Sequence, residues 1–297
     1  MFYSACLIFA IFGSIIGSFS VAQVWRLRAL ELNDAKKNGE KIDMKEWSKL
    51  KNLVESKKNK DRSHCLNCGY QLKWFDLIPI FSWLSLGGKC RKCRKSIGWL
   101  EFLAEVSTAV VFVLVFVSLG FDFSKEITPV QAFRTFMLFV SLSSLVILFI
   151  YDAKWSLLPV RIMWIFNFLA FVFFVLGVFE KGFSFEIISN LTLSILAFPA
   201  VYLLLSVVSK GAWVGDGDWI LALGLVLLLP NSPVFSLLLM MFSNVIGLVM
   251  ILLNSIFEKK KLVRGAQIPF GPAMILACLV LLIFQTIFIE IVDFLVV

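Results

Sequence analysis

Long apolar runs, separated by polar or Pro/Gly-bearing stretches, recur from one end of the chain to the other. A transmembrane helix needs about 20 consecutive apolar residues to cross a hydrocarbon core of about 30 Å. The runs predict eight membrane helices, at residues 3–24, 101–120, 133–151, 160–179, 185–208, 219–230, 234–257 and 268–292. The sixth run is short, with a rise of only about 18 Å, and needs its neighbours to complete a crossing.

Composition agrees with a chain that lives in a bilayer. Hydrophobic residues make up 60% of the 297 positions and the mean hydropathy is +0.90, whereas about half of a soluble domain is apolar. One cleaved signal peptide cannot account for runs that continue to the last residues, and the first run lacks a basic start and a small-residue cleavage site. We therefore predict an all-α integral membrane protein that retains its first span.

Charge is concentrated in one segment. Residues 26–95 contain 18 Lys and Arg against 8 Asp and Glu, a net charge of +10, while the whole chain carries +8. Such a segment stays in the cytoplasm by the positive-inside rule and lies near anionic membrane lipid, which explains its charge better than nucleic-acid binding does. We expect a first span at 1–24, a basic cytoplasmic loop at 25–100 with a surface helix near 44–54, and a membrane core at 101–297.

The predicted sidedness can be checked by counting spans from that loop. Residues 152–161, 210–218 and the basic stretch 258–264 then fall on the cytoplasmic side, and the intervening loops are balanced or acidic. Both Asp152, which closes the third run, and Asp218, which opens the sixth, emerge on this same side.

Four cysteines in the basic loop form two C-x-x-C pairs. Cys65 and Cys68 are separated by 21 residues from Cys90 and Cys93. Two such pairs supply the four thiolates of a tetrahedral structural zinc site, with no open position for a catalytic water. Two disulfides or four unliganded thiols are the alternatives, and a reducing cytoplasm argues against disulfides. The neighbouring His64 is a substitute ligand or an ordinary loop histidine.

Ionisable groups at membrane depth are costly and mark candidate functional sites. Asp152 and Asp218 are such groups, and glycines at 215 and 217 permit a sharp turn and close approach before Asp218. Two carboxylates that share a proton are the apparatus of an aspartyl protease, in which one activates water and the other protonates the substrate carbonyl. Taken singly, each aspartate could instead be a helix cap.

Five segments occur along the chain in the order typical of one family. They are Gly17-Ser18-Phe19 with Trp25-Arg26-Leu27, Ile78-Pro79-Ile80 with Ser82-Trp83-Leu84, Asp152 with Leu158-Pro159, Gly215-Asp216-Gly217-Asp218 with Ala222-Leu223-Gly224, and Ile268-Pro269-Phe270-Gly271-Pro272. They resemble the GSF…YRL, IPI-x-SWL, D-x₅-LP, G-x-G-D…ALG and IPFGP signatures of the prepilin peptidases of type IV pilus and type II secretion systems.

This resemblance implies a bacterial inner-membrane aspartic endopeptidase with Asp152 and Asp218 as its catalytic residues. Its substrates would be prepilin or pseudopilin precursors, cut at the cytoplasmic membrane face. The resemblance also implies N-methylation of the new N-terminus with S-adenosylmethionine, for which no binding residues are assigned. The chain departs from the family pattern at Arg28, where the pattern has proline, and at further positions where it has mainly polar residues: Val21, Leu77, Leu100-Glu101-Phe102, Val160 and Ile220. The sequence thus favours cleavage over methyl transfer.

Two other functions fit parts of the pattern. A presenilin-like intramembrane protease shares a Tyr-Asp and G-x-G-D pair, here Tyr151-Asp152 and Asp218, but carries a PAL motif and lacks the cysteine loop. A non-enzymatic transporter or scaffold would use the zinc loop for a partner and the aspartates as ion ligands or caps. The sequence does not indicate an oligomeric state.

Overall fold

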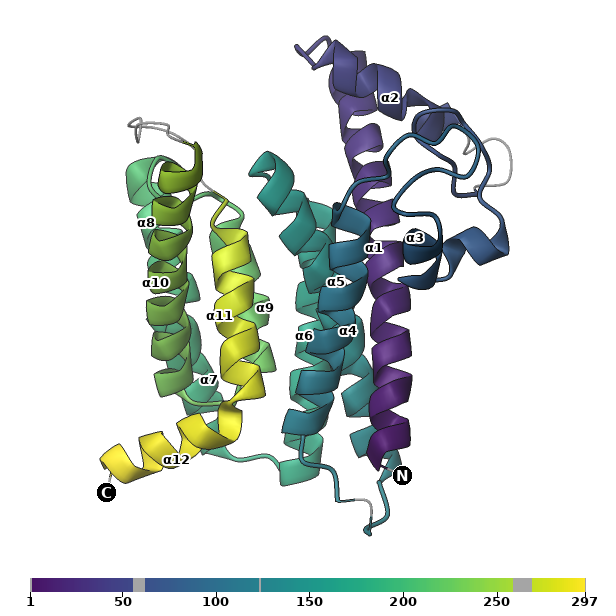
Figure 1. Cartoon of the computed structure of the whole chain (residues 1–297). Coiled ribbons are helices and arrows are strands. Elements are labelled where there is room, and N and C mark those ends of the chain that lie inside the picture. The colour runs from purple at the N-terminus through teal and green to yellow at the C-terminus, as the bar shows by residue number, and fades with distance from the viewer. Residues whose placement is uncertain (1, 56–61, 123, 259–268, 297) are drawn as a thin grey trace. The chain divides into compact units, whose positions relative to one another are not determined.

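A computed structural model of the chain describes residues 2–55, 62–122, 124–258 and 269–296 (Figure 1). Within these residues the structure is helical, and its only extended pairings are two isolated bridges. The elements are α1 (Phe2–Lys37), α2 (Met44–Glu55), the 3-10 helix η2 (Trp74–Leu77), α3 (Phe81–Ser85), α4 (Leu100–Ser118), α5 (Pro129–Trp155), α6 (Val160–Lys181), α7 (Phe185–Ala197), α8 (Pro199–Ser209), α9 (Asp218–Leu228), α10 (Pro233–Glu258), α11 (Gly271–Ile283) and α12 (Gln285–Val296).

Among the described residues, six helices are long and apolar enough to cross a membrane, with α7 and α8 together forming one of them. A seventh crossing is formed if α11 and α12, which bend by 76° at their junction, count as one span. The described helix α9 has only 11 residues, as expected for the short sixth run. The chain is thus an all-α membrane protein, with up to seven full-length spans where eight were predicted.

The chain folds as two compact units, residues 2–113 and 114–297. In the first unit α1 has 36 residues, so it is about 54 Å long and continues well past a 30 Å core. Its C-terminal part packs against α2 through Ala29, Leu32 and Leu50, which are nearly fully buried. The predicted surface helix near 44–54 is therefore confirmed as α2. The predicted domain boundaries at 24 and 100 stay a prediction.

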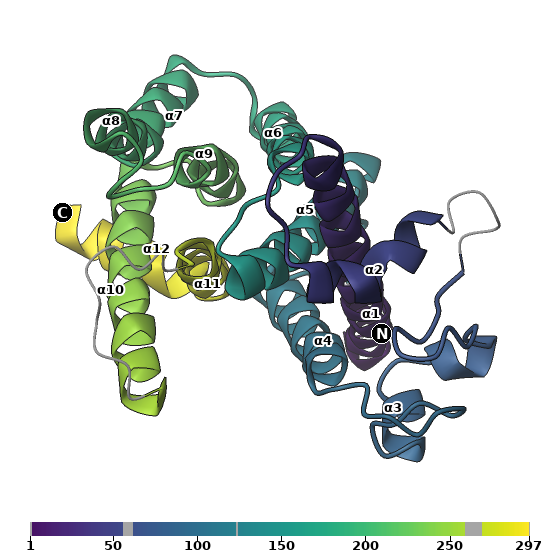
Figure 2. The same cartoon turned by 90° about the horizontal axis from the view of Figure 1, so that it is seen from above.

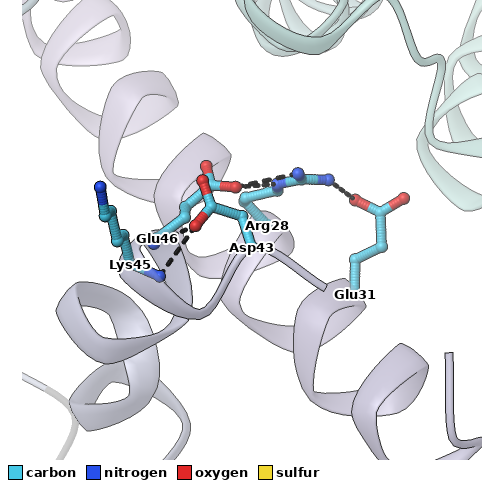
Figure 3. A network of polar contacts seen from close by, with 5 residues as sticks. All are labelled: Arg28, Glu31, Asp43, Lys45 and Glu46. Carbon is cyan, nitrogen blue, oxygen red and sulfur yellow. Dashed lines mark hydrogen bonds and ion pairs between the residues drawn. The ribbon is translucent and has the colours of Figure 1, made fainter. Parts of the chain in front are cut away.

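Salt bridges and hydrogen bonds link α2 to α1 (Figure 3). The guanidinium of Arg28 donates to Glu46 at 2.9 Å and to Glu31 at 3.0 Å, while Asp43 accepts a hydrogen bond from the backbone amide of Lys45 at the start of α2. Arg28 stands where the family pattern has proline. Because proline would remove a helical hydrogen bond here, arginine both continues α1 and links it to α2.

Close packing joins α1 to α4 within the same unit. A Cβ atom added at Gly17 would lie 2.5 Å from the carbonyl oxygen of Ala104, and one added at Gly13 would lie 2.8 Å from the Cα of Ala109. Only glycine permits this approach, which is typical of small residues between membrane helices. The glycine of the Gly17-Ser18-Phe19 segment therefore has a packing role.

The second unit packs α9 among several other helices. Helix α9 packs against α6, α8 and α11, and α11 also packs against α5. Figure 2 shows α9 among α6, α7 and α11 when the molecule is seen from above. This arrangement brings the end of α5 and the beginnings of α9 and α11 into one region. Two features named from sequence, the basic positions at 259–264 and Ile268, lie outside the described residues.

Candidate active site and metal centre

Asp152 lies one turn before the end of α5. The helix stops at Trp155 because Ser156 adopts a left-handed conformation with φ 52°, and the Ser156 amide donates to the Asp152 carbonyl at 2.8 Å. The residue is 4% exposed. Its carboxylate Oδ2 accepts a hydrogen bond of 2.8 Å from the backbone N–H of Gly271, the first residue of α11. This amide is one of the donors that a helix leaves unsatisfied at its N-terminus, so Asp152 joins two helix ends.

Asp218 is the first residue of α9 and is 8% exposed. Its Oδ2 accepts a hydrogen bond of 2.9 Å from the amide of Gly215, and its own amide donates to the Gly215 carbonyl at 3.1 Å. The two bonds close a tight turn before the helix. A carboxylate at this helix end also interacts favourably with the positive end of the helix dipole.

The structure brings these two aspartates into the same region. Leu158 lies beside both segments, because a Cβ added at Gly217 would lie 3.1 Å from its Cδ1 and one added at Gly271 would lie 3.3 Å from its Cδ2. Two buried carboxylates therefore lie in the same region of the structure. Leu158 packs against the backbone next to each of them.

Asp216, the other acid of the Gly215–Asp218 turn, has a different environment. It is exposed, and its Oδ1 accepts a hydrogen bond of 2.5 Å from the hydroxyl of Ser206 on α8. Its bond to Ser206 links the turn to α8. Asp216 is a matched control for Asp218, because it lies in the same turn but bonds to a different partner.

Sequence reasoning did not identify several residues that support the pair. Tyr202 is 4% exposed, donates to the amide oxygen of Asn244 at 3.3 Å, and stacks on Phe270 with ring centroids 5.8 Å apart. Asn167 on α6 donates to the Ile220 carbonyl in the first turn of α9 at 2.9 Å. Their signal was available, because polar side chains inside apolar runs mark interior positions of membrane proteins.

The four cysteines of the basic loop meet in one cluster. The sulfur atoms of Cys65 and Cys93 are 3.9 Å apart, those of Cys68 and Cys90 are 4.0 Å apart, and all four lie within 4.8 Å of one another. Four sulfurs placed 2.3 Å from a shared tetrahedral ion would be about 3.8 Å apart. Disulfides would need sulfur separations of about 2 Å, and all four cysteines are free. The cluster could hold a metal ion, and its geometry fits zinc.

Backbone hydrogen bonds shape both C-x-x-C pairs of the cluster. A backbone hydrogen bond closes a turn around each C-x-x-C pair. The Gly69 amide donates to the Cys65 carbonyl and the Arg94 amide donates to the Cys90 carbonyl, both at 2.9 Å. Hydrogen bonds, the largest from the Cys93 amide, lower the pKa of the Cys90 thiol to about 7, whereas burial raises the pKa of the Cys65 thiol to about 12, so Cys90 forms the thiolate that metals bind more readily than Cys65 does. His64 instead forms an isolated antiparallel bridge with Gln71 and, among the described residues, is not part of the cluster.

Comparison with known proteins defines the class of the chain. Residues 11–119, which include the four cysteines, match the family described as the bacterial peptidase A24 N-terminal domain. No solved structure matches the chain. The chain is thus a polytopic helical membrane protein with a peptidase A24 N-terminal domain.

Curated relatives make the assignment more specific. The chain is 32% identical over 37% of its length to a prepilin leader peptidase/N-methyltransferase of Vibrio cholerae, and 36% identical over 34% to a leader peptide-processing enzyme of type 4 prepilin-like proteins from Escherichia coli. These matches span 37% and 35% of the two relatives. A prepilin leader peptidase/N-methyltransferase of Dichelobacter nodosus is 27% identical over 90% of the chain and 87% of its own length. The chain is thus similar to prepilin leader peptidases over most of its length, which confirms the resemblance seen in its ordered motifs.

Proposed function

We propose that this chain is a membrane aspartyl endopeptidase that removes the leader peptide from prepilin-like precursors, with Asp152 and Asp218 as its catalytic pair. The observation that carries the proposal is that two buried carboxylates, at the end of α5 and the beginning of α9, lie in one region beside the shared Leu158. The similarity to curated relatives suggests the substrate class, because those proteins are named for processing prepilin leaders.

The chemistry follows from two acids that differ in protonation. The ionised carboxylate takes a proton from a water molecule, which then attacks the carbonyl carbon of the scissile peptide bond. The protonated carboxyl donates its proton to the carbonyl oxygen. The carboxyl that took the proton from water then gives it to the nitrogen, the other carboxylate takes a proton back from the hydroxyl of the tetrahedral intermediate, and the C–N bond breaks. Burial at a helix end makes each charge act strongly on the other, so that one proton shared by the pair is favoured over two ionised groups.

The four-cysteine cluster has a structural role in this proposal. Cys65, Cys68, Cys90 and Cys93 would hold one zinc ion, which when bound cross-links the two C-x-x-C pairs of the loop. The basic excess of residues 26–95 favours a cytoplasmic position for this loop in the bacterial inner membrane. The active site would then face the cytoplasm, where a basic leader peptide begins.

Co-expression with a prepilin precursor tests the assignment, and the intact mass of the product is the measurement. Asp152→Asn and Asp218→Asn should each abolish removal of the leader, since either change removes one of the two proton-transfer groups while nearly preserving shape. Asp216→Asn is the matched control, because it changes an acid of the same turn that bonds to Ser206 instead. Cleavage by either of the first two variants, in protein that is inserted normally, would reject the pair.

N-methylation of the new N-terminus is a second candidate activity. The printed names of several relatives include N-methyltransferase, and S-adenosylmethionine would be the donor. The same mass measurement separates the activities, because a product that has lost its leader differs from a methylated product by one methyl group. Loss of the leader without added methyl would limit the chain to peptide cleavage.

A further inference from the structure

One stretch of the basic loop differs sharply from its surroundings. Residues 77–88 contain no charged side chain, although residues 26–95 contain 26. The large apolar side chains here are exposed in the structure: Phe81 by 72% and Leu84 by 57%, both on α3. Trp99, which directly precedes α4, is exposed by 64%. Exposed apolar clusters outside the membrane-crossing segments mark surfaces that another phase or molecule covers.

The position of α3 follows from the length of α4. Helix α4 has 19 residues, a rise of about 28 Å, so it just crosses a hydrocarbon core of about 30 Å and its first turn lies at the membrane boundary. Trp83 of α3 packs against that turn, with its ring 4.6 Å from Phe102, and its indole N–H donates to the Gly98 carbonyl at 2.9 Å. Figures 1 and 2 show α3 beside this end of α4.

A second hydrogen bond to this part of the chain sets the orientation of α3. Ile80 precedes the helix with φ 63°, and its backbone N–H donates to the Glu105 carboxylate of α4 at 2.6 Å. Glu105 is 6% exposed. A branched residue with positive φ requires support from its surroundings, and the buried carboxylate supplies it. Since Ile80 before α3 is bonded to Glu105 of α4 and Trp83 within α3 is bonded to Gly98 just before α4, the exposed apolar side chains of α3 stay at the depth of the membrane boundary.

We propose that Phe81, Leu84 and Trp99 form a membrane-interface anchor that inserts into the lipid surface around the first turn of α4. Phe81 and Leu84 lie three residues apart and therefore on one face of α3, and Trp99 is held beside Trp83 with ring centroids 4.6 Å apart. Aromatic side chains concentrate at the headgroup level of bilayers. The covering phase is lipid because the anchor continues directly into a membrane helix.

The charges beside the anchor fit the same surface. Past Gly88 the chain carries five cations within seven residues: Lys89, Arg91, Lys92, Arg94 and Lys95. Cations next to an inserted apolar group add attraction to anionic headgroups. This stretch also carries Cys90 and Cys93, so the anchor would hold the four-cysteine cluster against the membrane surface.

Photocrosslinking in vesicles tests the anchor directly. Benzoylphenylalanine is placed at Phe81 or at Leu84 in the full chain, which is reconstituted in vesicles of phosphatidylethanolamine and phosphatidylglycerol. The matched control carries the probe at Lys49, an exposed position on α2, which packs against the part of α1 that continues beyond its apolar run. After irradiation, mass spectrometry measures the yield of lipid adducts for each position.

Lipid adducts several-fold more abundant at Phe81 and Leu84 than at Lys49 are the expected result. Equal yields at all three positions, or no lipid adducts at the two α3 positions, would overturn the anchor. Protein adducts in place of lipid adducts at these positions would overturn it also, because another chain would then cover the surface. The experiment can be done in the Asp152→Asn background, so its outcome is independent of peptide cleavage.

Discussion

The glycine that begins α11 offers a sharp test of the candidate active site. In Gly271→Ala the new Cβ would lie 2.7 Å from Oδ2 of Asp152 and 3.3 Å from a methyl group of Leu158. Ordinary contacts between such atoms are at about 3.5–4.0 Å. The carboxylate must therefore move by about 1 Å, and its hydrogen bond to the Gly271 amide lengthens or breaks.

The size of the effect can be estimated in two ways. A hydrogen bond to a charged group contributes about 1.5–3 kcal/mol, and each 1.36 kcal/mol on a barrier changes a rate tenfold, so its loss corresponds to a decrease of about 10- to 150-fold. Displacement of a catalytic group by about 1 Å can cost about 100-fold on its own. We expect the cleavage rate of Gly271→Ala to fall by about two orders of magnitude.

The assay is the initial rate of leader removal from a purified precursor by detergent-solubilised enzyme. Gly177→Ala is the control, because a Cβ there meets the flexible guanidinium of Arg134 at 3.1 Å, and alanine is favoured over glycine inside a helix. This control should cleave at nearly the wild-type rate. If Gly271→Ala cleaves as fast as the wild type, the Gly271 amide does not position a catalytic carboxylate.

Two further predictions concern the metal and the pair of acids. The wild-type chain should contain bound zinc by elemental mass spectrometry and Cys90→Ser should contain far less, whereas Cys6→Ser should match the wild type because Cys6 lies outside the cluster; equal zinc in Cys90→Ser and the wild type would contradict the site. The cleavage rate should pass through a maximum with pH, because one acid must be ionised and the other protonated. A rate that stays constant across the range where carboxylates titrate would argue against proton sharing by Asp152 and Asp218.

The sequence pattern was sufficient for most helices and insufficient where tertiary contacts decide. Runs at 101–120 and 160–179 correspond closely to α4 and α6, because a continuous apolar stretch leaves the backbone no alternative to a helix in lipid. The first helix continues to Lys37, 13 residues beyond the predicted run. Those residues mix charged and apolar side chains, and their helix is stabilised by packing against α2, which no local pattern encodes.

Breaks within apolar runs were also missed. The run at 185–208 is divided between α7 and α8 at Phe198, where Pro199 begins a new helix. Proline cannot donate the helical hydrogen bond, so it favours the first turn of a helix over its interior. That signal was present in the sequence. The 76° bend between α11 and α12 occurs at Phe284, where neither glycine nor proline marks it.

The candidate site shows the same division between local and distant information. The turn before Asp218 was predictable from its glycines, because the two partners of the Gly215 hydrogen bond are three residues apart. The donor to Asp152 is 119 residues away, and spacing along a chain does not show which distant amide reaches a carboxylate. The motif containing Gly271 was found in the sequence, but its contact with Asp152 appeared only in the structure.

Both candidate carboxylates accept a hydrogen bond from the backbone of a glycine, Gly271 for Asp152 and Gly215 for Asp218. An adjacent lysine or arginine would hold a carboxylate ionised, because an opposite charge strongly favours the charged form. An amide N–H orients the carboxylate while adding no net charge, which leaves the pair able to exchange a single proton. Glycine suits this task because its backbone can approach without a Cβ in the way. The glycines of the two motifs thus explain in physical terms how two acids can be fixed in place and still differ in protonation.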